Sequence, residues 1–218
     1  MPDDSGESAA LGLRERKKRR TRATLIDAAI QLCERQGFEQ TTVEQIAAMA
    51  DVSPRTFSRY FSTKEAVCMA LVDDAIDVAA AELAQLPEDM NHLEALCRAS
   101  VTMYRNTKTA GIGGLTAPRL MCTLRIIMSS PTLRQATMEF RPHAVNVELA
   151  KRMGVGLEDR ALRLVAASWA AIIMTALADL GMATNWRGVD IDDAVDRIEE
   201  TFAQFVGLID DISVARRS

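Results

Sequence analysis

The chain has 218 residues, of which 48% are hydrophobic and 26% are charged, and its formal net charge is −4. This balance is ordinary for a soluble globular protein, and the length suits one large domain or two small ones. Aromatic residues make up only 5% of the chain, and no strand-like alternation bounded by turns stands out. The sequence therefore predicts an all-α fold.

The net charge conceals an uneven distribution. Residues 1–13 contain three acidic residues and no basic one, lack the apolar core of a signal peptide, and have the composition of a disordered tail. Residues 14–64 carry eleven Lys and Arg against six Asp and Glu, whereas residues 65–218 carry fifteen against twenty-one. Contact with a polyanion is therefore expected in the N-terminal quarter of the chain.

The longest uncharged apolar stretch runs from Leu164 to Ala178. A membrane-spanning helix needs about 20 residues, so this stretch is interpreted as a helix buried on most sides. A cytoplasmic protein that contacts no membrane is expected.

Enzyme chemistry finds little support in the sequence. The chain has two histidines, His92 and His143, and it contains no GxSxG, P-loop or HExxH motif. No cofactor and no metal site is expected. The four cysteines form no CxxC pair and no zinc-finger spacing, and they are interpreted as small core residues in a reducing cytosol: Cys33, Cys68, Cys97 and Cys122.

Helix-start signals follow one another closely after a first helix that ends near Gly37, a candidate C-cap. Thr42 with Gln45 forms a capping box that opens a short helix over 43–50. Ser53-Pro54 places an N-cap before a proline at the first helical position and opens a helix to about residue 61. Two short helices joined by such a brief turn predict a helix-turn-helix.

A further capping box, Ser62 with Glu65, predicts a connecting helix that ends before Pro87. Longer helices are expected over 90–107, 115–129, 131–153, 158–182 and 190–211. The predicted organisation is a tail over 1–13, a helix-turn-helix domain over 14–64, a connecting helix over 65–86 and a larger helical domain over 87–218.

The helix that begins at Pro54 has the amphipathic character of a recognition helix. Phe57 and Phe61 are four residues apart and are expected to face the core, which leaves Arg55, Ser58 and Arg59 pointing outward. An arginine can bind guanine O6 and N7 together, which contributes roughly 1–3 kcal/mol of discrimination. Candidate phosphate contacts, together with the two helix N-termini, are Thr42, Val43, Ser53, Thr56, Tyr60 and Lys64.

Seven of the nine residues from Arg14 to Arg22 are basic. This run is interpreted as an arm that follows DNA phosphates or enters a minor groove, and the alternative is a solvated helical turn. The arm residues expected at DNA are Arg16, Lys17, Lys18, Arg19 and Arg20.

Residues 41–47 (TTVEQIA) and 52–65 (VSPRTFSRYFSTKE) closely resemble the DNA-binding domain of TetR-family regulators. The resemblance covers about residues 18–75. It implies a three-helix head, a connecting helix, and a helical domain that binds a ligand and dimerises. It also implies phosphate contacts by Thr42, Thr56, Tyr60 and Lys64, and base contacts by Pro54, Arg55, Ser58 and Arg59.

Apolar residues recur at spacings of 4, 3, 4, 3 and 4 from residue 191, which is the pattern of a coiled-coil seam. The pattern favours a dimer interface built from this helix and the apolar helix before it, and the alternative is packing inside one chain. The residues expected at the interface are Val165, Ile198, Phe202 and Phe205.

Methionines and aromatic residues in the helices between about 90 and 182 suggest a pocket for an apolar or amphipathic ligand, although for each residue taken alone plain core packing is the stronger explanation. The candidate ligand residues are Met103, Tyr104, Met121, Arg125, Trp169 and Ile173. Arg119 and His143 are weaker polar candidates.

Together these features predict a dimeric repressor that binds a pseudo-palindromic operator in double-stranded DNA and is released by a small-molecule effector. A ligand-independent DNA-binding regulator and a transcriptional activator are the alternatives that remain open.

Overall fold

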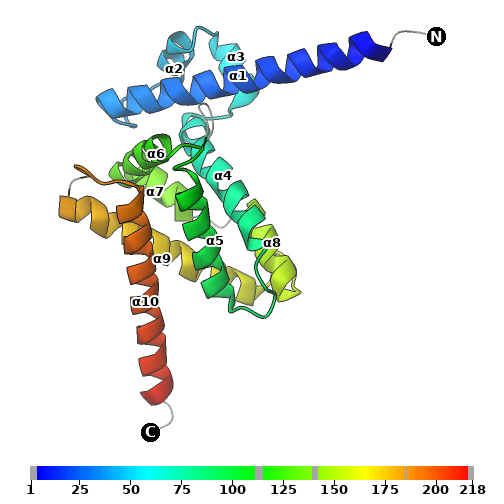
Figure 1. Cartoon of the computed structure of the whole chain (residues 1–218). Coiled ribbons are helices and arrows are strands. Elements are labelled where there is room, and N and C mark those ends of the chain that lie inside the picture. Colours follow the sequence, from blue (N-terminus) through cyan, green and yellow to red (C-terminus); the bar gives the residue numbers. More distant parts are fainter. Residues whose placement is uncertain (1–3, 111–114, 139–141, 185, 216–218) are drawn as a thin grey trace. The chain divides into compact units, whose positions relative to one another are not determined.

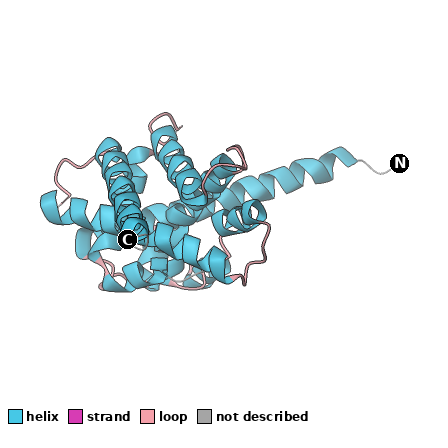
Figure 2. Cartoon of the chain, turned by 90° about the horizontal axis from the view of Figure 1, so that it is seen from below, coloured by secondary structure: helices cyan, strands magenta, loops and turns pink. Residues whose placement is uncertain are grey.

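The computed structural model describes residues 4–110, 115–138, 142–184 and 186–215. Over these residues every regular element is a helix, and Figure 2 shows no strand among them. The prediction of an all-α fold is therefore confirmed. The helices are α1 (Asp4–Gln36), α2 (Val43–Met49), α3 (Pro54–Tyr60), α4 (Lys64–Leu83), α5 (His92–Asn106), α6 (Ala117–Ser129), α7 (Pro131–Met138), α8 (Ala144–Met153), α9 (Arg160–Thr184) and α10 (Ile191–Ala215).

The chain divides into two compact units, residues 1–70 and residues 71–218. The division falls inside α4, so one continuous helix belongs to both units.

In the first unit, α1 contacts α2, and α2 contacts α3 (Figure 1). Four large side chains with at most 2% exposure form the centre of this unit: Leu25, Ile26, Ile46 and Phe57. Gly37 ends α1 with a φ of 81°, and its N–H donates to the carbonyl of Cys33 (2.9 Å). Because only glycine adopts this left-handed conformation without strain, the predicted C-cap is confirmed.

Two helix starts differ from the sequence-based expectation. α1 begins at Asp4, so residues 4–13, which were expected to be a disordered tail, are helical; Glu7, Ala9 and Ala10 favour that state. α4 begins at Lys64, and the backbone amide of Ala66 in its first turn donates to the Thr63 hydroxyl (3.2 Å). Thr63 and not Ser62 is therefore the capping residue.

In the second unit, α9 is the central helix, because it contacts α5, α6, α7, α8 and α10. Its buried residues recur at helical spacing: Leu162, Trp169, Ile172, Ala176 and Leu177. They pack with buried apolar residues of α5 and α6, which include Leu96 and Leu120.

The prediction of a single helix over 131–153 is wrong. The structure has two helices there, α7 and α8, and α8 starts after Pro142 and His143. Proline has no backbone N–H and clashes with the preceding turn, so a helix does not run through it without a kink. Arg152 near the end of α8 donates to the carbonyls of Leu86 (2.9 Å) and Pro87 (2.6 Å), which ties α8 to the loop before α5.

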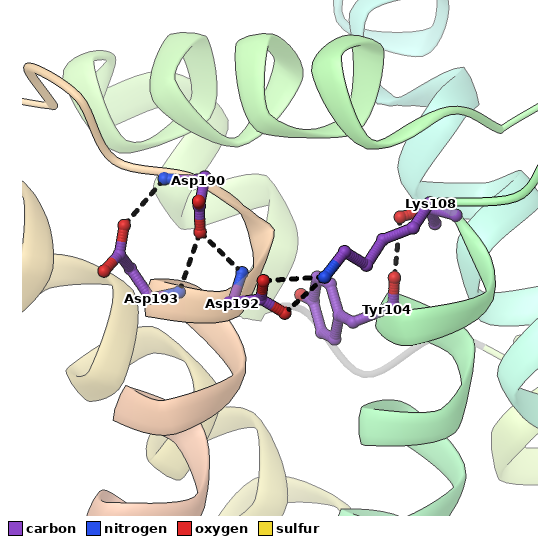
Figure 3. A network of polar contacts seen from close by, with 6 residues as sticks. Tyr104, Lys108, Asp190, Asp192 and Asp193 are labelled. Atoms are coloured by element: carbon purple, nitrogen blue, oxygen red, sulfur yellow. Dashed lines mark hydrogen bonds and ion pairs between the residues drawn. The ribbon is translucent and has the colours of Figure 1, made fainter.

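Ion pairs join α5 and the residues just after it to α10 at the surface of the second unit, and Figure 3 shows the pair of Lys108 with Asp192. Lys108 Nζ lies 2.7 Å from a carboxylate oxygen of Asp192, and Arg105 lies 3.4 Å from Glu199. The Asp190 carboxylate accepts from the backbone amides of Asp192 and Asp193 and so caps α10. These exposed pairs each contribute little to stability, but they orient two packed helices.

Candidate DNA-binding site

The site is built on two short helices whose ends are capped by side chains. Thr42 accepts from the amide of Gln45 (3.3 Å), and the Gln45 side chain accepts from the amide of Thr42 (3.0 Å), so the predicted capping box is confirmed. The Gln36 side chain donates to the Gln45 carboxamide oxygen (2.9 Å) and thereby holds the start of α2 against the end of α1.

The turn between α2 and α3 reverses the chain within four residues. Asp51 adopts a φ of 53°, in the left-handed region that Asp tolerates better than most residues. The amide of Val52 donates to the carbonyl of Ala47 (2.9 Å), which closes the end of α2.

Helix α3 starts as predicted, with Ser53 as N-cap and Pro54 at the first turn. The amide of Thr56 donates to the Ser53 hydroxyl (3.1 Å). Phe57 is 1% exposed and its ring lies 5.9 Å from that of Phe61, so one face of α3 is anchored in the core.

The opposite face of α3 is exposed and polar. Arg55, Ser58 and Arg59 are all exposed, as the sequence predicted. The Ser58 hydroxyl donates its hydrogen to the carbonyl of Pro54 (3.1 Å), so it can serve a DNA partner as a hydrogen-bond acceptor. The Arg59 guanidinium lies 5.4 Å from the Tyr60 ring centre, an arrangement that restrains the arginine while leaving its N–H groups accessible.

The candidate phosphate contacts differ in how available they are. Thr42 and Ser53 are exposed at the two N-caps, and Val43, Thr56 and Tyr60 are half-buried next to them. Lys64 is engaged inside the unit, because its ammonium donates to the carbonyls of Phe38 (3.2 Å), Glu39 (3.4 Å) and Thr41 (3.1 Å). These three acceptors match its three hydrogens, so Lys64 positions the turn before α2, and a phosphate contact by it would compete with them.

The basic run lies on α1, and residues 14–20 are all exposed. Glu15 pairs with Arg19 at 3.3 Å, so one of the charges is partly balanced within the helix. The run is a helical extension of the unit that carries α3, which is compatible with the arm proposed from the sequence.

Three residues that shape this site were not singled out from the sequence. Thr41 is 1% exposed and donates to the carbonyl of Gly37 (2.9 Å), Gln36 bridges α1 to α2, and the Arg22 guanidinium lies 5.8 Å from the Phe61 ring centre. Gln36 and Arg22 act through residues further along the chain and Thr41 through the turn just before it, and helical periodicity gives no signal for such interactions.

Two short helices, a tight turn, and a second helix with one buried and one arginine-bearing face define a helix-turn-helix DNA-binding domain. A model of the family described as "Bacterial regulatory proteins, tetR family" matches residues 25–71, which contain this site. The HTH-type transcriptional regulator TcmR of Streptomyces glaucescens is 36% identical over 154 residues, which is 68% of this chain and 67% of TcmR. The chain belongs to the TetR family and is a DNA-binding transcriptional regulator.

The chain is also similar to a further curated protein and to a solved structure. The HTH-type transcriptional regulator RutR of Escherichia coli K12 is 32% identical over 91 residues, which is 42% of this chain and 43% of RutR. A solved structure of Thermus thermophilus FadR, a TetR-family repressor in complex with lauroyl-CoA, covers 84% of this chain and 93% of its own, with 22% identity and a TM-score of 0.46.

The residues predicted to bind a ligand lie on three helices of the second unit. Met103 and Tyr104 on α5, Met121 on α6 and Trp169 on α9 are buried, and Ile173 on α9 is half-buried. Since α9 contacts both α5 and α6, these side chains come from neighbouring helices. Arg125 is exposed on α6, and His143 is the half-buried N-cap residue of α8, 3.9 Å from Asp73.

The predicted dimerisation residues fall into two groups. Ile198 has 0% exposure within its own chain, so it belongs to the core of the second unit and offers no surface to a partner. Val165, Phe202 and Phe205 are half-buried, and the Trp169 and Phe202 rings meet edge to face at 6.3 Å. The first half of the predicted seam is therefore intramolecular, which is the alternative that the periodicity left open.

Apolar surface remains on the same two helices. Leu164 is 60% exposed on α9, and Leu208 (65%) and Ile209 (49%) are exposed on the C-terminal half of α10, which projects from the other helices of its unit (Figure 1). By length and composition alone, Arg160–Asp179 could cross a membrane, with a mean hydropathy of 1.8 and only 28% of the window buried. This surface is the feature that a protein partner would cover.

Proposed function

We propose that this TetR-family regulator is a cytoplasmic repressor that binds a pseudo-palindromic operator as a homodimer and is released by an apolar or amphipathic small molecule. One observation about α3 most directly supports sequence-specific recognition of DNA. Phe57 fixes α3 in the core, while Arg55 and Arg59 on its other face are exposed. Such a helix can enter a major groove and place guanidinium groups against guanine edges.

A homodimer follows from the same proposal. A single seven-residue α3 reads only a few base pairs, and helix-turn-helix proteins reach specificity by placing two such helices about one helical turn of DNA apart. The exposed apolar residues of α9 and α10 provide a surface on which a second protomer can pack. Packing of that kind takes this apolar surface out of water without insertion into a membrane. Val165, Phe202 and Phe205 lie beside this surface and remain the proposed interface residues.

The effector is proposed to bind in the second unit among Met103, Tyr104, Met121, Trp169 and Ile173. Methionine side chains adapt to ligands of varied shape, and a buried tyrosine or tryptophan can offer one polar contact. Because α4 runs from Lys64, beside the DNA-binding turn, to Leu83 in the second unit, it is the proposed lever. A difference in effector affinity between two states of about 1–3 kcal/mol is sufficient for regulation.

The decisive experiment is the selection of bound duplexes from a random DNA pool with the full-length protein. We expect enrichment of an inverted repeat whose half-sites lie about 10 base pairs apart. Arg55→Ala and Arg59→Ala should each relax the preference at a particular base pair, with a loss of about 1–3 kcal/mol there. Arg98→Ala is the matched control, because Arg98 is an exposed arginine of the second unit paired with Glu94 (2.7 Å).

Failure to enrich any sequence, or the same enriched sequence in the Arg55→Ala and Arg59→Ala variants, would contradict the proposed reading face. Adding candidate apolar compounds to the selected duplex complex then tests release. A compound that binds tightly without changing operator affinity is not the effector.

A further inference from the structure

Two buried cysteines from distant parts of the chain meet inside the DNA-binding unit. Cys33 lies near the end of α1 and Cys68 lies in the first half of α4, and their sulfur atoms are 3.6 Å apart. The two side chains are 5% and 4% exposed. Cys97 is also buried but has no such thiol neighbour within the residues that the structure describes, so the Cys33–Cys68 pair is a specific feature of this unit.

The surroundings of the two sulfurs differ. The Cys33 thiol donates to the Thr41 hydroxyl (3.8 Å), and Lys64 donates to the Thr41 carbonyl (3.1 Å), so a positive charge lies nearby. Hydrogen bonding with Cys68, together with Thr41 and the charge of Lys64, lowers the pKa of Cys33 despite its burial. The same hydrogen bond, burial and the Glu65 carboxylate raise the pKa of Cys68. Cys33 is therefore the better nucleophile of the two.

We propose that Cys33 and Cys68 are an oxidation-sensitive pair, which a hydroperoxide converts into a disulfide that weakens operator binding. The regulatory half of this proposal depends on the proposed reading of an operator by α3, whereas formation of the disulfide does not.

The chemistry balances with one hydroperoxide molecule. The Cys33 thiolate attacks the terminal oxygen, the O–O bond breaks, and the alkoxide leaves and takes up the proton that Cys33 released. Cys33 is thereby oxidised to a sulfenic acid, and the peroxide is reduced. The Cys68 sulfur then attacks the Cys33 sulfur, an S–S bond forms, the S–O bond breaks, and water leaves with the Cys68 proton. A dithiol reductant reverses the product by two exchange steps.

Formation of the bond requires a local movement. A disulfide has an S–S length of about 2.05 Å, so the two sulfurs must approach from 3.6 Å by roughly 1.5 Å. The bond closes a loop that contains α2 and α3 entirely. Cys33 and Lys64 both contact Thr41, next to the Thr42 N-cap, so drawing α1 and α4 together disturbs the turn that sets the position of α2. We therefore expect α3 of the oxidised protein to be displaced from the position that binds the operator, and operator affinity to fall.

The test uses the full-length Cys97→Ser, Cys122→Ser protein, in which only the pair remains. Hydrogen peroxide is added, intact mass and peptide mapping follow the disulfide, and titration with the selected duplex follows affinity. We expect a loss of two hydrogens, a Cys33–Cys68 cross-linked peptide, and at least a tenfold weaker operator affinity that dithiothreitol restores. The Cys33→Ser, Cys68→Ser protein, which keeps Cys97 and Cys122, should bind DNA equally well before and after peroxide.

Two outcomes overturn the proposal. A folded protein that shows no cross-linked peptide after peroxide has no such pair, and a cross-linked protein with unchanged affinity has no such switch. If the reduced protein binds no duplex, the proposed operator reading has failed instead. Hydrogen exchange at residues 38–49 then decides the structural effect, because identical exchange in the reduced and cross-linked proteins would refute the displaced turn.

Discussion

The ammonium group of Lys64 lies 4.4 Å from the centre of the Phe38 ring. The same nitrogen donates hydrogen bonds to backbone carbonyls of the turn that contains Phe38 and ends at Thr41. The first residue of α4 is thus attached to the segment that leads into α2. A basic residue that resembles a DNA contact in the sequence is, in the structure, part of the support for the DNA-binding helices.

Replacing Lys64 should therefore reduce stability as well as DNA binding. Lys64→Met removes the hydrogen bonds of the ammonium to the carbonyls of Phe38 and Thr41, of which the Phe38 carbonyl still accepts from the Thr41 amide (3.1 Å). We expect the free energy of unfolding to fall by about 1–3 kcal/mol. Lys18→Met removes the same charge from an exposed position and should leave stability unchanged while weakening DNA binding modestly. Urea unfolding of both variants checks this, and equal stabilities would show that Lys64 has no supporting role.

Phe57 is the anchor of α3, and its truncation should detach that helix from the core. Phe57→Ala is expected to reduce the free energy of unfolding by about 3–5 kcal/mol, because it removes a side chain that is 1% exposed. Phe57→Leu keeps most of the volume and should cost less. Chemical denaturation followed by circular dichroism compares the two. A loss below about 1 kcal/mol for Phe57→Ala would mean that α3 is held elsewhere.

The basic run of α1 should contribute to affinity through phosphate binding and not through base recognition. Removing one phosphate interaction reduces the slope of log affinity against log salt by about 0.9. Deleting residues 11–19 should therefore weaken binding and flatten this slope, while the preferred sequence stays the same. Deleting residues 2–10, which contain no basic residue, is the matched control. An unchanged slope in the shorter arm would show that the run does not reach DNA.

The exposed apolar surface of α10 should determine the oligomeric state. Leu208→Asp places a charge on a residue that is 65% exposed in one chain and proposed to be buried in the dimer. We expect this variant to be monomeric by light scattering and to bind the operator much more weakly. Thr102→Asp adds the same charge to an exposed position on α5 and should remain dimeric. A wild-type protein that is monomeric at all concentrations would contradict the proposed dimer interface.

Tyr104 gives the second unit a measurable response to alkaline pH. Burial raises the pKa of Tyr104 from 10.0 to about 12. The unfolded chain therefore loses this proton first, so the contribution to stability is complete below pH 10 and is lost as the pH rises towards 12. The free energy of unfolding should fall by about 2–3 kcal/mol in total over this pH range.

The measurement is straightforward because the chain has two tyrosines. In a Tyr60→Phe protein, phenolate absorbance should report Tyr104 alone, with a midpoint clearly above 10. Tyr104→Phe should remove this part of the pH dependence of unfolding. A midpoint near 10 would show that the Tyr104 hydroxyl is accessible to water.

Much of the DNA-binding unit could be predicted because its signals are local. Thr42 with Gln45, and Ser53 with Pro54, fix two helix starts within four residues each, and the four-residue spacing of Phe57 and Phe61 fixes the face of α3. The choice between Ser62 and Thr63 as the cap of α4 was not local. Both carry a hydroxyl, and the turn around Phe38 that holds Lys64 lies more than 20 residues earlier.

The second unit was less predictable for a different reason. Apolar spacing in α10 is the same whether the neighbour belongs to the same chain or to a partner, so it could not show that Ile198 is internal while Leu208 is exposed. Buried methionines have the same pattern in a core and in a pocket. The break between α7 and α8 is different, because Pro142 was visible in the sequence and was sufficient to predict it.

In α3, the aromatic side chain that anchors the helix in the core and the arginines that face outward are different residues. Phe57 packs in the core, whereas Arg55, Ser58 and Arg59 are exposed. Of these three, Ser58 donates one hydrogen bond to the Pro54 carbonyl, and the Arg59 guanidinium lies beside the Tyr60 ring. A duplicated copy of the gene could therefore acquire a new target through changes in three codons, without any compensating change in the core. The same separation makes this helix a suitable scaffold for engineering regulators with altered target sequences.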